Sequence, residues 1–522
     1  MNTKEFVDKM NLTIEDLKLI EEHGLTLSQV SYQVEQLKKG TKYLKLSEAC
    51  TVENGILRIS GNEKQKFIKI YEDHVKSNLV IKFVPASGAA SRMFKKLESF
   101  MLASENLALD QNYTSDEKTY IQHFFKNIKN FPFYTELSEV LEKNKLNIEK
   151  LLLEKKFKEI LEFLLTPHGM NYSNLPKALI QFHQYKNESR VSLEEQIVEA
   201  IEYIKSSEQS INLHFTISED MKGEFEAKAN LLAKKYRSKC EISTSFSFQK
   251  KSTDTVALDS NQNIFRENDK ILFRPGGHGA LIENLNELDA DLIFIKNIDN
   301  VQREENLSVT IDNKKLLGGL LIKYQSQIHS YITKLNISYD INFIEEIEEF
   351  LSKELGYQFD LGYTNYSLDE KQKYLLDFLN RPIRVCGVVV NEGHPGGGPF
   401  WVEDENGNFT KQIVEGNQIK LEDDKQRQIY NSSTHFNPVD IVCGIKDAKR
   451  KKFDLIKYVD NQAVLVSKKS KDGKELNALE LPGLWNGGMS DWITIFVEVP
   501  SATFTPVKEV NDLLKNYHLG SL

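Results

Sequence analysis

Short apolar runs alternate with stretches of helical spacing over the first part of the chain, up to residue 296. The predicted strands lie at 79–84 and 291–296, which are mostly apolar, at 211–217, which alternates apolar and polar residues, and at 241–248; the helical spacing lies at 193–205 and 223–236. A short apolar run is typical of a buried strand, whereas apolar residues three and four positions apart are typical of a helix with one buried face. Strands that alternate with helices predict an α/β fold with a mixed, mainly parallel sheet.

Charge-rich blocks with helical patterning interrupt this alternation at 1–75, 92–165 and 315–380. In the first block, Thr13 followed by Asp16 predicts a helix start of the capping-box type, and Gly40 predicts a helix end. After residue 383 the pattern favours strands, which we place at 383–390, 440–445, 453–459, 463–467 and 493–499. The predicted parts are an N-terminal helical extension (1–75), an α/β core (76–320) with a helical insertion at about 95–170, a second helical insertion (321–382), and a strand-rich part that completes the core (383–522).

Composition and charge narrow the class of protein. Of the 522 residues, 40% are hydrophobic and 27% are charged, which is ordinary for a globular chain and excludes wholesale disorder or a coiled-coil rod. The net charge of −9 argues against broad binding to nucleic acid. The four cysteines form no CxxC pair, and no apolar run is long enough to cross a membrane. We therefore expect a cytoplasmic protein without a nucleic-acid or membrane partner; the oligomeric state is left open.

Two segments combine small residues or proline with a cation. Residues 84–93 (Val-Pro-Ala-Ser-Gly-Ala-Ala-Ser-Arg-Met) carry a strand into a loop of small residues that ends at Arg92. Such a loop lets a phosphate approach backbone N–H groups, and a guanidinium neutralises its oxygens. Lys177 follows Pro176, which predicts a cation fixed at the start of a helix. Taken alone, each segment is better explained by a plain turn or helix cap with a solvated side chain.

Two further segments place polar residues after strands. Residues 273–281 (Phe-Arg-Pro-Gly-Gly-His-Gly-Ala-Leu) surround His278 with glycines, which leaves room for a flat or charged ligand. Residues 293–301 (Ile-Phe-Ile-Lys-Asn-Ile-Asp-Asn-Val) deliver Asp299 to the end of a strand, the edge at which α/β sheets bind ligands. One carboxylate at that edge suffices for Mg²⁺ when substrate phosphates supply further oxygens. A glycine-rich turn and an ordinary turn after a strand are the alternatives.

Three segments near the C-terminus complete the candidates. Glu392 and His394 lie in the glycine-rich stretch 391–401, and Asn437 lies in the stretch Ser-Thr-His-Phe-Asn. Lys508 follows Pro506-Val507 and is a candidate point charge for a phosphate. The histidines show no HExxH spacing, so a zinc hydrolase is rejected.

In this order, the segments resemble the UDP-sugar pyrophosphorylase family of nucleotidyltransferases. The resemblance is carried by Pro-Gly-Gly-His-Gly at 275–279, by Ile-Phe-Ile-Lys-Asn-Ile-Asp-Asn at 293–300 and by the Pro-Val-Lys…Asp-Leu-Leu stretch at 506–514. Ser-Gly-Ala-Ala-Ser-Arg at 87–92 looks like a degenerate form of the family's glycine-rich loop, and Leu-Pro-Lys at 175–177 looks like its Pro-Lys. The whole chain also resembles a bacterial family described only as a domain of unknown function.

The resemblance implies a GT-A-like, nucleotide-diphospho-sugar transferase fold and a reaction in which a sugar 1-phosphate attacks a nucleoside triphosphate to give an NDP-sugar and pyrophosphate. It implies that the 76–320 part binds the nucleotide and that the 383–522 part binds the sugar phosphate. By the same carry-over, the catalytic cations are Arg92, Lys177 and Lys508; the nucleotide contacts are Ser87, Gly88, Gly276, Gly277 and His278; the sugar contacts are Asn437, Glu392 and His394; and Asp299 holds Mg²⁺.

Two alternatives remain open from the sequence. One is a glycosyltransferase that uses a sugar nucleotide on a similar fold, although Asn297-Ile298-Asp299 contains one carboxylate where a metal motif of the Asp-x-Asp type has two. The other is a catalytically silent protein that binds a sugar nucleotide, which the degenerate loop at 87–92 favours. The base and the sugar are not specified by any of these residues.

Overall fold

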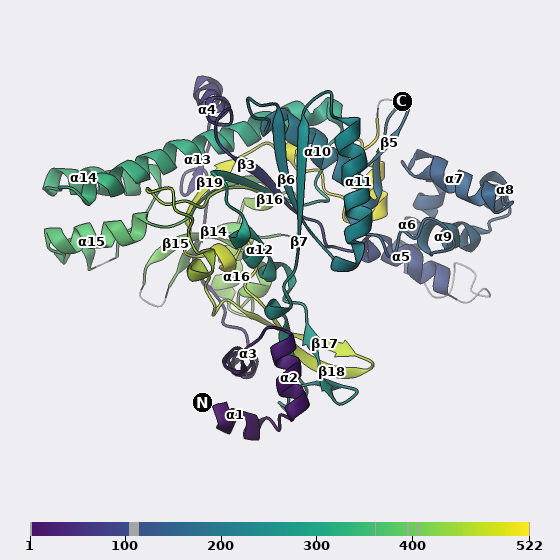
Figure 1. Cartoon of the computed structure of the whole chain (residues 1–522), viewed down its shortest axis with the longest axis horizontal. Helices are drawn as coiled ribbons and strands as arrows, with labels where there is room; N and C mark the ends of the chain where they lie inside the picture. Colours follow the sequence, from purple (N-terminus) through teal and green to yellow (C-terminus); the bar gives the residue numbers. More distant parts are fainter. Residues whose placement is uncertain (1–2, 104–113, 361, 394–395, 405–406, 521–522) are drawn as a thin grey trace. The chain divides into compact units, whose positions relative to one another are not determined.

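A computed structural model describes residues 3–103, 114–360, 362–393, 396–404 and 407–520 (Figure 1). The chain folds into two compact units, and each unit is built from three separate stretches of sequence. Unit 1 contains Met1–Val80, Ser247–Ile295 and Lys315–Pro500, and unit 2 contains Ile81–Phe246, Lys296–Lys314 and Ser501–Leu522.

Parallel strands form the centre of unit 2. Strand β3 (Val80–Pro85) pairs in parallel with β6 (Ser210–Ile217), and β7 (Glu241–Phe248) is the next strand beyond β6. Helix α10 (Ser192–Tyr203) precedes β6, and α11 (Lys222–Lys235) connects β6 to β7. All of these elements lie within one or two residues of their predicted bounds, because each has an uninterrupted strand or helix pattern. A small antiparallel hairpin, β4 (Gln181–Gln184) with β5 (Ser189–Val191), leads into α10.

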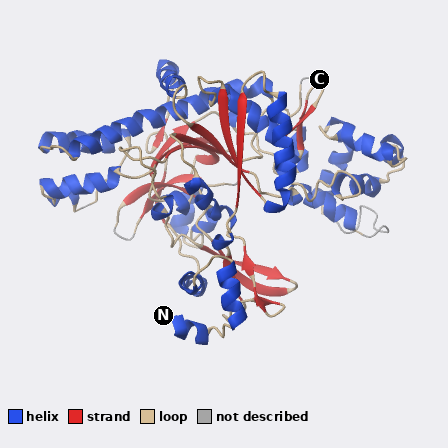
Figure 2. Ribbon diagram, in the orientation of Figure 1, coloured by secondary structure: helices blue, strands red, loops and turns tan. Residues whose placement is uncertain are grey.

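A cluster of helices makes up the rest of unit 2. These helices, drawn in blue in Figure 2, are α5 (Ser91–Leu102), α6 (Ser115–Lys126), α7 (Tyr134–Lys143), α8 (Ile148–Leu153) and α9 (Phe157–Leu165). They occupy the stretch for which a helical insertion is predicted. Their buried faces form one apolar core rich in phenylalanine, to which Val507, Val510 and Leu513 of the C-terminal segment also belong. The helical cluster thereby holds the segment that carries Lys508.

Unit 1 contains a mixed sheet. Its strand order is β2 (Ile56–Leu57), β19 (Ile493–Glu498), β13 (Ile383–Val390), β16 (His435–Gly444), β12 (Leu292–Lys296). Strand β19 is parallel to both β2 and β13, whereas β13 and β16 are antiparallel. Together with the parallel β3–β6 pair of unit 2, this arrangement confirms the predicted mixed, mainly parallel α/β class with helical insertions.

Smaller sheets and the N-terminal helices surround this centre in unit 1. One sheet has the order β1 (Lys45–Ala49), β14 (Gly398–Glu403), β15 (Phe409–Val414); another has the order β11 (Phe273–Arg274), β8 (Thr255–Leu258), β18 (Lys474–Glu480), β17 (Leu465–Lys471); and β9 (Arg266–Glu267) pairs with β10 (Lys270–Ile271). Helices α1 (Thr3–Lys9), α2 (Ile14–Glu22) and α3 (Leu27–Lys39) share an apolar core with strands β8 and β18. The capping box of Thr13 and Asp16 and the helix end at Gly40 are both confirmed.

The remaining helices are α4 (Gly61–His74), α12 (Leu281–Glu287), α13 (Leu307–Leu335), α14 (Ile341–Glu349), α15 (Leu368–Leu379) and α16 (Asp424–Asn431). The strand predicted at 453–459 is wrong, because a 3-10 turn spans Leu455–Tyr458. There the N–H of Leu455 donates to the Asn286 side chain and the N–H of Lys457 donates back to Asp454, so no strand ladder forms. No helix within the described ranges is long and apolar enough to cross a membrane.

Candidate functional site

Three of the predicted site residues meet in unit 2. The ammonium of Lys177 lies 2.8 Å from Asp299 Oδ2, and that of Lys508 lies 3.2 Å from the same oxygen. Lys177 also donates to the carbonyl oxygen of Val507 at 2.9 Å, directly beside Lys508. The three residues come from distant parts of the sequence, so their meeting is a property of the fold. We call Lys177, Asp299 and Lys508 the charge cluster.

Burial differs sharply across the charge cluster. Asp299 is 8% exposed, and the side chain of Lys177 is 12% exposed, whereas that of Lys508 is 58% exposed. Burial by itself raises the pKa of Asp299, but the two ammonium groups outweigh it and hold that pKa below its usual value. Asp299 is therefore ionised at neutral pH, and the cluster carries one net positive charge on a face that solvent reaches through Lys508.

The small-residue loop after β3 is joined to the segment of Lys177. The N–H of Ala90 donates to Leu175 O at 2.9 Å, and the N–H of Lys177 donates to Gly88 O at 3.2 Å. The sequence separates these segments widely, and the helices α5 to α9 account for the separation. Ser87 and Gly88 are exposed, and Arg92 is exposed in the first turn of α5 without an ion pair to any described residue. The open backbone of Ser87 and Gly88 thus borders the Lys177 segment, and the exposed guanidinium of Arg92 follows in the first turn of α5.

One face of α10 fixes the residues just before Asp299. The hydroxyl of Ser192 donates to Ile298 O, the Gln196 amide donates to Asn297 O at 2.9 Å, and Glu199 Oε2 lies 2.5 Å from Lys296 Nζ. Positions 192, 196 and 199 share one face of a helix, so three consecutive residues of the chain are held by one helix. This attachment limits where the Asp299 carboxylate can lie.

Glu199 is also the centre of a buried ion network. It accepts from Lys82 at 3.0 Å as well as from Lys296, and all three side chains are at most 1% exposed. Burial lowers the pKa of Lys82 to about 7, although Glu199 opposes that shift. For Glu199, the neighbouring lysines outweigh the effect of burial and lower the pKa to about 2. The network therefore keeps an ionised carboxylate in place behind the charge cluster.

The C-terminal segment that carries Lys508 is attached at several points. The N–H of Val507 donates to Asp299 O at 2.9 Å, and the N–H of Thr505 donates to Asn300 Oδ1 at 3.0 Å. Further along, the ring of His518 meets His183, with 2.7 Å between His518 Nδ1 and His183 Nε2. His183 in turn contacts Glu195 at 2.8 Å, so a fully buried row of side chains secures the end of the chain.

The predicted nucleotide loop at 276–278 belongs to unit 1. Gly277 has a positive φ of 69° and open space where a side chain would be. A Cβ on Gly276 would lie 2.4 Å from Thr253 O, so that glycine is required by packing against the protein itself. His278 is exposed, and its ring stacks on Trp485 with 4.7 Å between centroids. The pair presents a flat aromatic surface. Trp485 lies in the stretch 484–488 (Leu-Trp-Asn-Gly-Gly), whose residues alone do not indicate His278 as a partner.

The predicted sugar contacts also lie in unit 1. Asn437 is buried, and its amide is used within the fold: Nδ2 donates to Gly387 O at 2.8 Å and Oδ1 accepts from the N–H of Val439 at 2.9 Å. These bonds hold a bulge in which Val439 has a φ of 62°, an outlier for a β-branched residue. Glu392 is exposed in its loop, and His394 lies outside the described residues.

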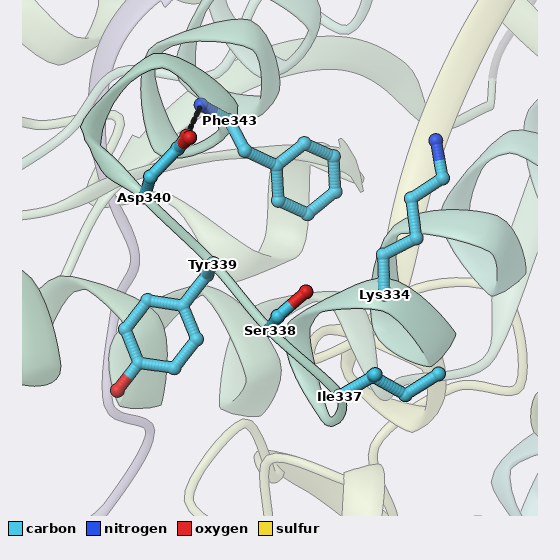
Figure 3. A pocket seen from close by; sticks show the side chains of 6 residues that line it. All are labelled: Lys334, Ile337, Ser338, Tyr339, Asp340 and Phe343. Carbon is cyan, nitrogen blue, oxygen red and sulfur yellow. Dashed lines mark hydrogen bonds between the residues drawn. The ribbon is translucent and has the colours of Figure 1, made fainter.

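Helix α13 and helix α14 meet at a corner that contains a shallow pocket, lined by Lys334, Ile337, Ser338, Tyr339, Asp340 and Phe343 (Figure 3). None of the predicted site residues lines it. Asp340 is occupied there as a helix cap, because its carboxylate accepts from the N–H of Phe343. This pocket therefore gives no indication of a reaction.

Asp299 can contribute to a Mg²⁺ site, but it does not form one with the described protein ligands alone. The described residues contain no group of three or more metal-ligating side chains. Asp299 is a lone hard oxygen donor whose Oδ2 already meets two ammonium groups. Mg²⁺ commonly uses one carboxylate together with waters and substrate phosphates. The residues thus fit an ion that binds together with a phosphate ligand, and they do not form an all-protein cage.

Comparison with known proteins gives a family match over almost the whole chain. A family model covers residues 13–519, and the family is described as a domain of unknown function (DUF4301). No curated protein sequence is significantly similar to the chain.

Solved structures give distant likenesses. They include UDP-glucose pyrophosphorylase from Leishmania major (12% identity, TM-score 0.41, 96% of this chain and 77% of that chain covered). A UDP-glucose phosphorylase from Trypanosoma brucei gives 13% identity, a TM-score of 0.43 and coverage of 96% and 77%. The UDP-N-acetylglucosamine pyrophosphorylase of Trypanosoma brucei gives 11% identity, a TM-score of 0.41 and coverage of 90% and 72%. We infer the function from the side chains of the site and not from these likenesses.

Proposed function

The chain belongs to the DUF4301 family, a domain of unknown function, and we propose that it is a sugar-1-phosphate nucleotidyltransferase. The observation that carries the proposal is the charge cluster, in which Lys177 and Lys508 lie on either side of the Asp299 carboxylate. Two ammonium groups held by one buried carboxylate are positioned before any substrate binds. Phosphates can then replace part of that pairing.

In the proposed reaction, an oxygen of the sugar 1-phosphate attacks the α-phosphorus of a nucleoside triphosphate. A new oxygen–phosphorus bond forms, the bond from the α-phosphorus to the oxygen that bridges to the β-phosphate breaks, and pyrophosphate leaves with the electron pair. No proton has to be moved by the protein, since the attacking oxygen is already anionic. Such chemistry depends on positioning and on neutralising phosphate charge.

The chain's residues then have separable roles. Lys177, fixed by Asp299 and Val507 O, binds non-bridging phosphate oxygens from a rigid position. Lys508, which is largely exposed, closes on the same phosphates as a mobile point charge. Ser87 and Gly88, in the neighbouring loop, and Arg92, in the first turn of α5, bind the remainder of the triphosphate. Asp299 would hold Mg²⁺ when it binds with the nucleotide, and the ion would supply further neutralisation of charge on the phosphates.

The contacts to the base and the sugar stay predictions. For the base, Gly277 leaves open space and His278 with Trp485 offers a stacking surface. For the sugar, Glu392 is exposed, whereas both polar atoms of Asn437 are engaged with the backbone.

The test is release of pyrophosphate from each nucleoside triphosphate with a panel of sugar 1-phosphates, in the presence of Mg²⁺. We expect release with one pair of substrates and none when either substrate is omitted. If the folded protein releases nothing across the panel but transfers sugar from an NDP-sugar to an acceptor, it is a glycosyltransferase. If it is stabilised by a sugar nucleotide without any turnover, it is a silent binding protein.

A further inference from the structure

A second pocket, in unit 1, has cations, hydroxyl groups and aromatic rings in its wall. It has a volume of 40 Å³. The polar side chains in the wall are Arg381, Thr410, Lys411, Ser490 and Thr494, and the rings include Trp492. No carboxylate is present among the described residues that line it. A cavity needs about 10–15 Å³ of this volume to hold one water, so the pocket holds a group of a few heavy atoms and not a nucleotide.

The two cations of this wall have no carboxylate partner among the described residues. Lys411 is half-buried, donates to Leu355 O at 2.6 Å and lies 5.7 Å from the centroid of the Trp401 ring. Arg381 donates to Asp377 O at 3.3 Å and lies over the ring of Phe378. Burial lowers the pKa of Lys411 to about 8, which is the response of an ammonium that lacks a compensating anion. Burying an ammonium without an anion is costly, so a bound anion would offset the burial of Lys411.

Neighbouring N–H groups also lack acceptors. The indole of Trp492 is 4% exposed and its Nε1 has no acceptor among the described residues. Arg384, just behind the wall, donates to Thr494 Oγ1 at 2.9 Å and to Trp485 O at 2.6 Å, yet its second terminal nitrogen is buried without a partner. Buried donors are nearly always paired, so an excess of unpaired donors indicates a missing acceptor.

The pocket lies away from the edge at which substrates are expected. Ile493 and Thr494 begin β19, and Arg381 immediately precedes β13, which runs parallel to β19. The pocket is therefore at the amino ends of these strands, whereas ligands of open α/β sheets bind at the carboxyl ends. It shares no residue with the charge cluster.

We propose that this pocket binds a small oxyanion, either phosphate itself or a carboxylate group of similar size. Lys411 and Arg381 supply the opposite charge, and Thr410 and the indole N–H of Trp492 supply neutral donors from the wall. The aromatic rings exclude water from the mouth, which strengthens each charged contact. The proposal is independent of the proposed nucleotidyltransferase activity.

The test is titration of the full chain with inorganic phosphate and, separately, with acetate, followed by tryptophan fluorescence. Two of the three tryptophans, Trp401 and Trp492, line the pocket. We expect saturable binding of one anion, weakened about tenfold or more in Lys411→Gln, because a charge-assisted hydrogen bond is lost. Lys420→Gln removes an exposed lysine of the same unit and serves as the matched control. The anion that binds identifies the class of ligand.

Lys177→Gln distinguishes phosphate binding at the charge cluster from phosphate binding at this pocket. The variant changes the charge cluster only, so the fluorescence change that reports on the pocket should stay intact. Thermal unfolding gives a second readout: the anion should raise the melting temperature of the wild type and of Lys420→Gln, but not that of Lys411→Gln. If Lys411→Gln does not fold, Arg381→Gln replaces it. Absence of binding by both anions, or equal binding by the wild type and the Lys411 and Arg381 variants, would overturn the proposal.

Discussion

Lys177 Nζ lies 2.8 Å from Asp299 Oδ2, although the two residues are 122 positions apart in the chain. The contact is set by structure on both sides. The N–H of Lys177 is bonded to Gly88 O, and the residues before Asp299 are bonded to α10. A pair held in this way is set by the fold and is not a chance encounter of surface charges.

Loss of the fixed ammonium should slow the reaction. In Lys177→Met, we expect kcat for pyrophosphate release to fall about 10²–10³-fold, by analogy with removal of one charge-stabilising donor. Lys186→Gln changes an exposed lysine of the same unit and should leave kcat unaltered. Equal rates for the wild type and Lys177→Met would remove Lys177 from the mechanism.

Neutralising the carboxylate should separate binding from turnover. In Asp299→Asn, the two ammonium groups lose the anion that competes with phosphate for them. We therefore expect pyrophosphate to bind more tightly than to the wild type when Mg²⁺ is absent, while Mg²⁺-dependent turnover is lost. Calorimetric titration with and without Mg²⁺ checks the first part. Weaker binding of pyrophosphate without Mg²⁺ would show that Asp299 does not compete for the lysines.

The attachment of α10 to the segment before Asp299 predicts a positioning effect. Gln196→Ala removes the side-chain donor to Asn297 O, which keeps its bond from the N–H of Asn300 at 3.2 Å. We expect a loss of about 0.5–1.5 kcal/mol in the free energy of unfolding. If the attachment positions Asp299, kcat should fall while KM for the nucleotide changes little. A stability loss with kcat unchanged would limit Gln196 to a structural role.

Acid should weaken the anchor of the C-terminal segment. Burial lowers the pKa of His183 to about 3 and that of His518 well below its usual value. Below pH 6.5, the two histidines take up protons in the unfolded chain but stay neutral in the folded chain. Their contribution to the free energy of unfolding therefore falls as the pH falls. Denaturant unfolding at pH 7 and pH 5 should show this loss in the free energy of unfolding. The loss should be about 2 kcal/mol smaller in His518→Gln than in the wild type. A variant with the same pH dependence as the wild type would exclude His518 as the cause.

The sequence predicted the elements with the plainest patterns. The segment 79–84 is a mostly apolar run and 211–217 alternates apolar and polar residues, and the structure places β3 and β6 there. Strand β14 was not predicted, because its Gly-Pro start continues a glycine-rich stretch and its pairing with β1 and β15 is not visible in its own residues. The run at 453–459 has strand-like alternation, but its backbone donors are used by a side chain and a local turn.

The candidate site was likewise predicted from the sequence only in part. Lys177, Asp299 and Lys508 were identified by resemblance to a family, and the structure brings them together. Ser192, Gln196 and Glu199 were missed because they read as polar positions of an ordinary helix until their partners are known. The requirement for glycine at Gly276 was attributed to ligand space, whereas the structure shows packing against Thr253 O. Contacts between distant segments are not present in the local pattern.

The most direct test of the central claim is the reverse reaction. Labelled pyrophosphate is incubated with the full chain, Mg²⁺ and a panel of NDP-sugars, and label is measured in the nucleoside triphosphate. A nucleotidyltransferase predicts label in one triphosphate, dependent on one NDP-sugar and strongly reduced in Lys177→Met. Absence of label with every NDP-sugar, from protein shown to be folded and to bind a sugar nucleotide, would contradict the proposed reaction.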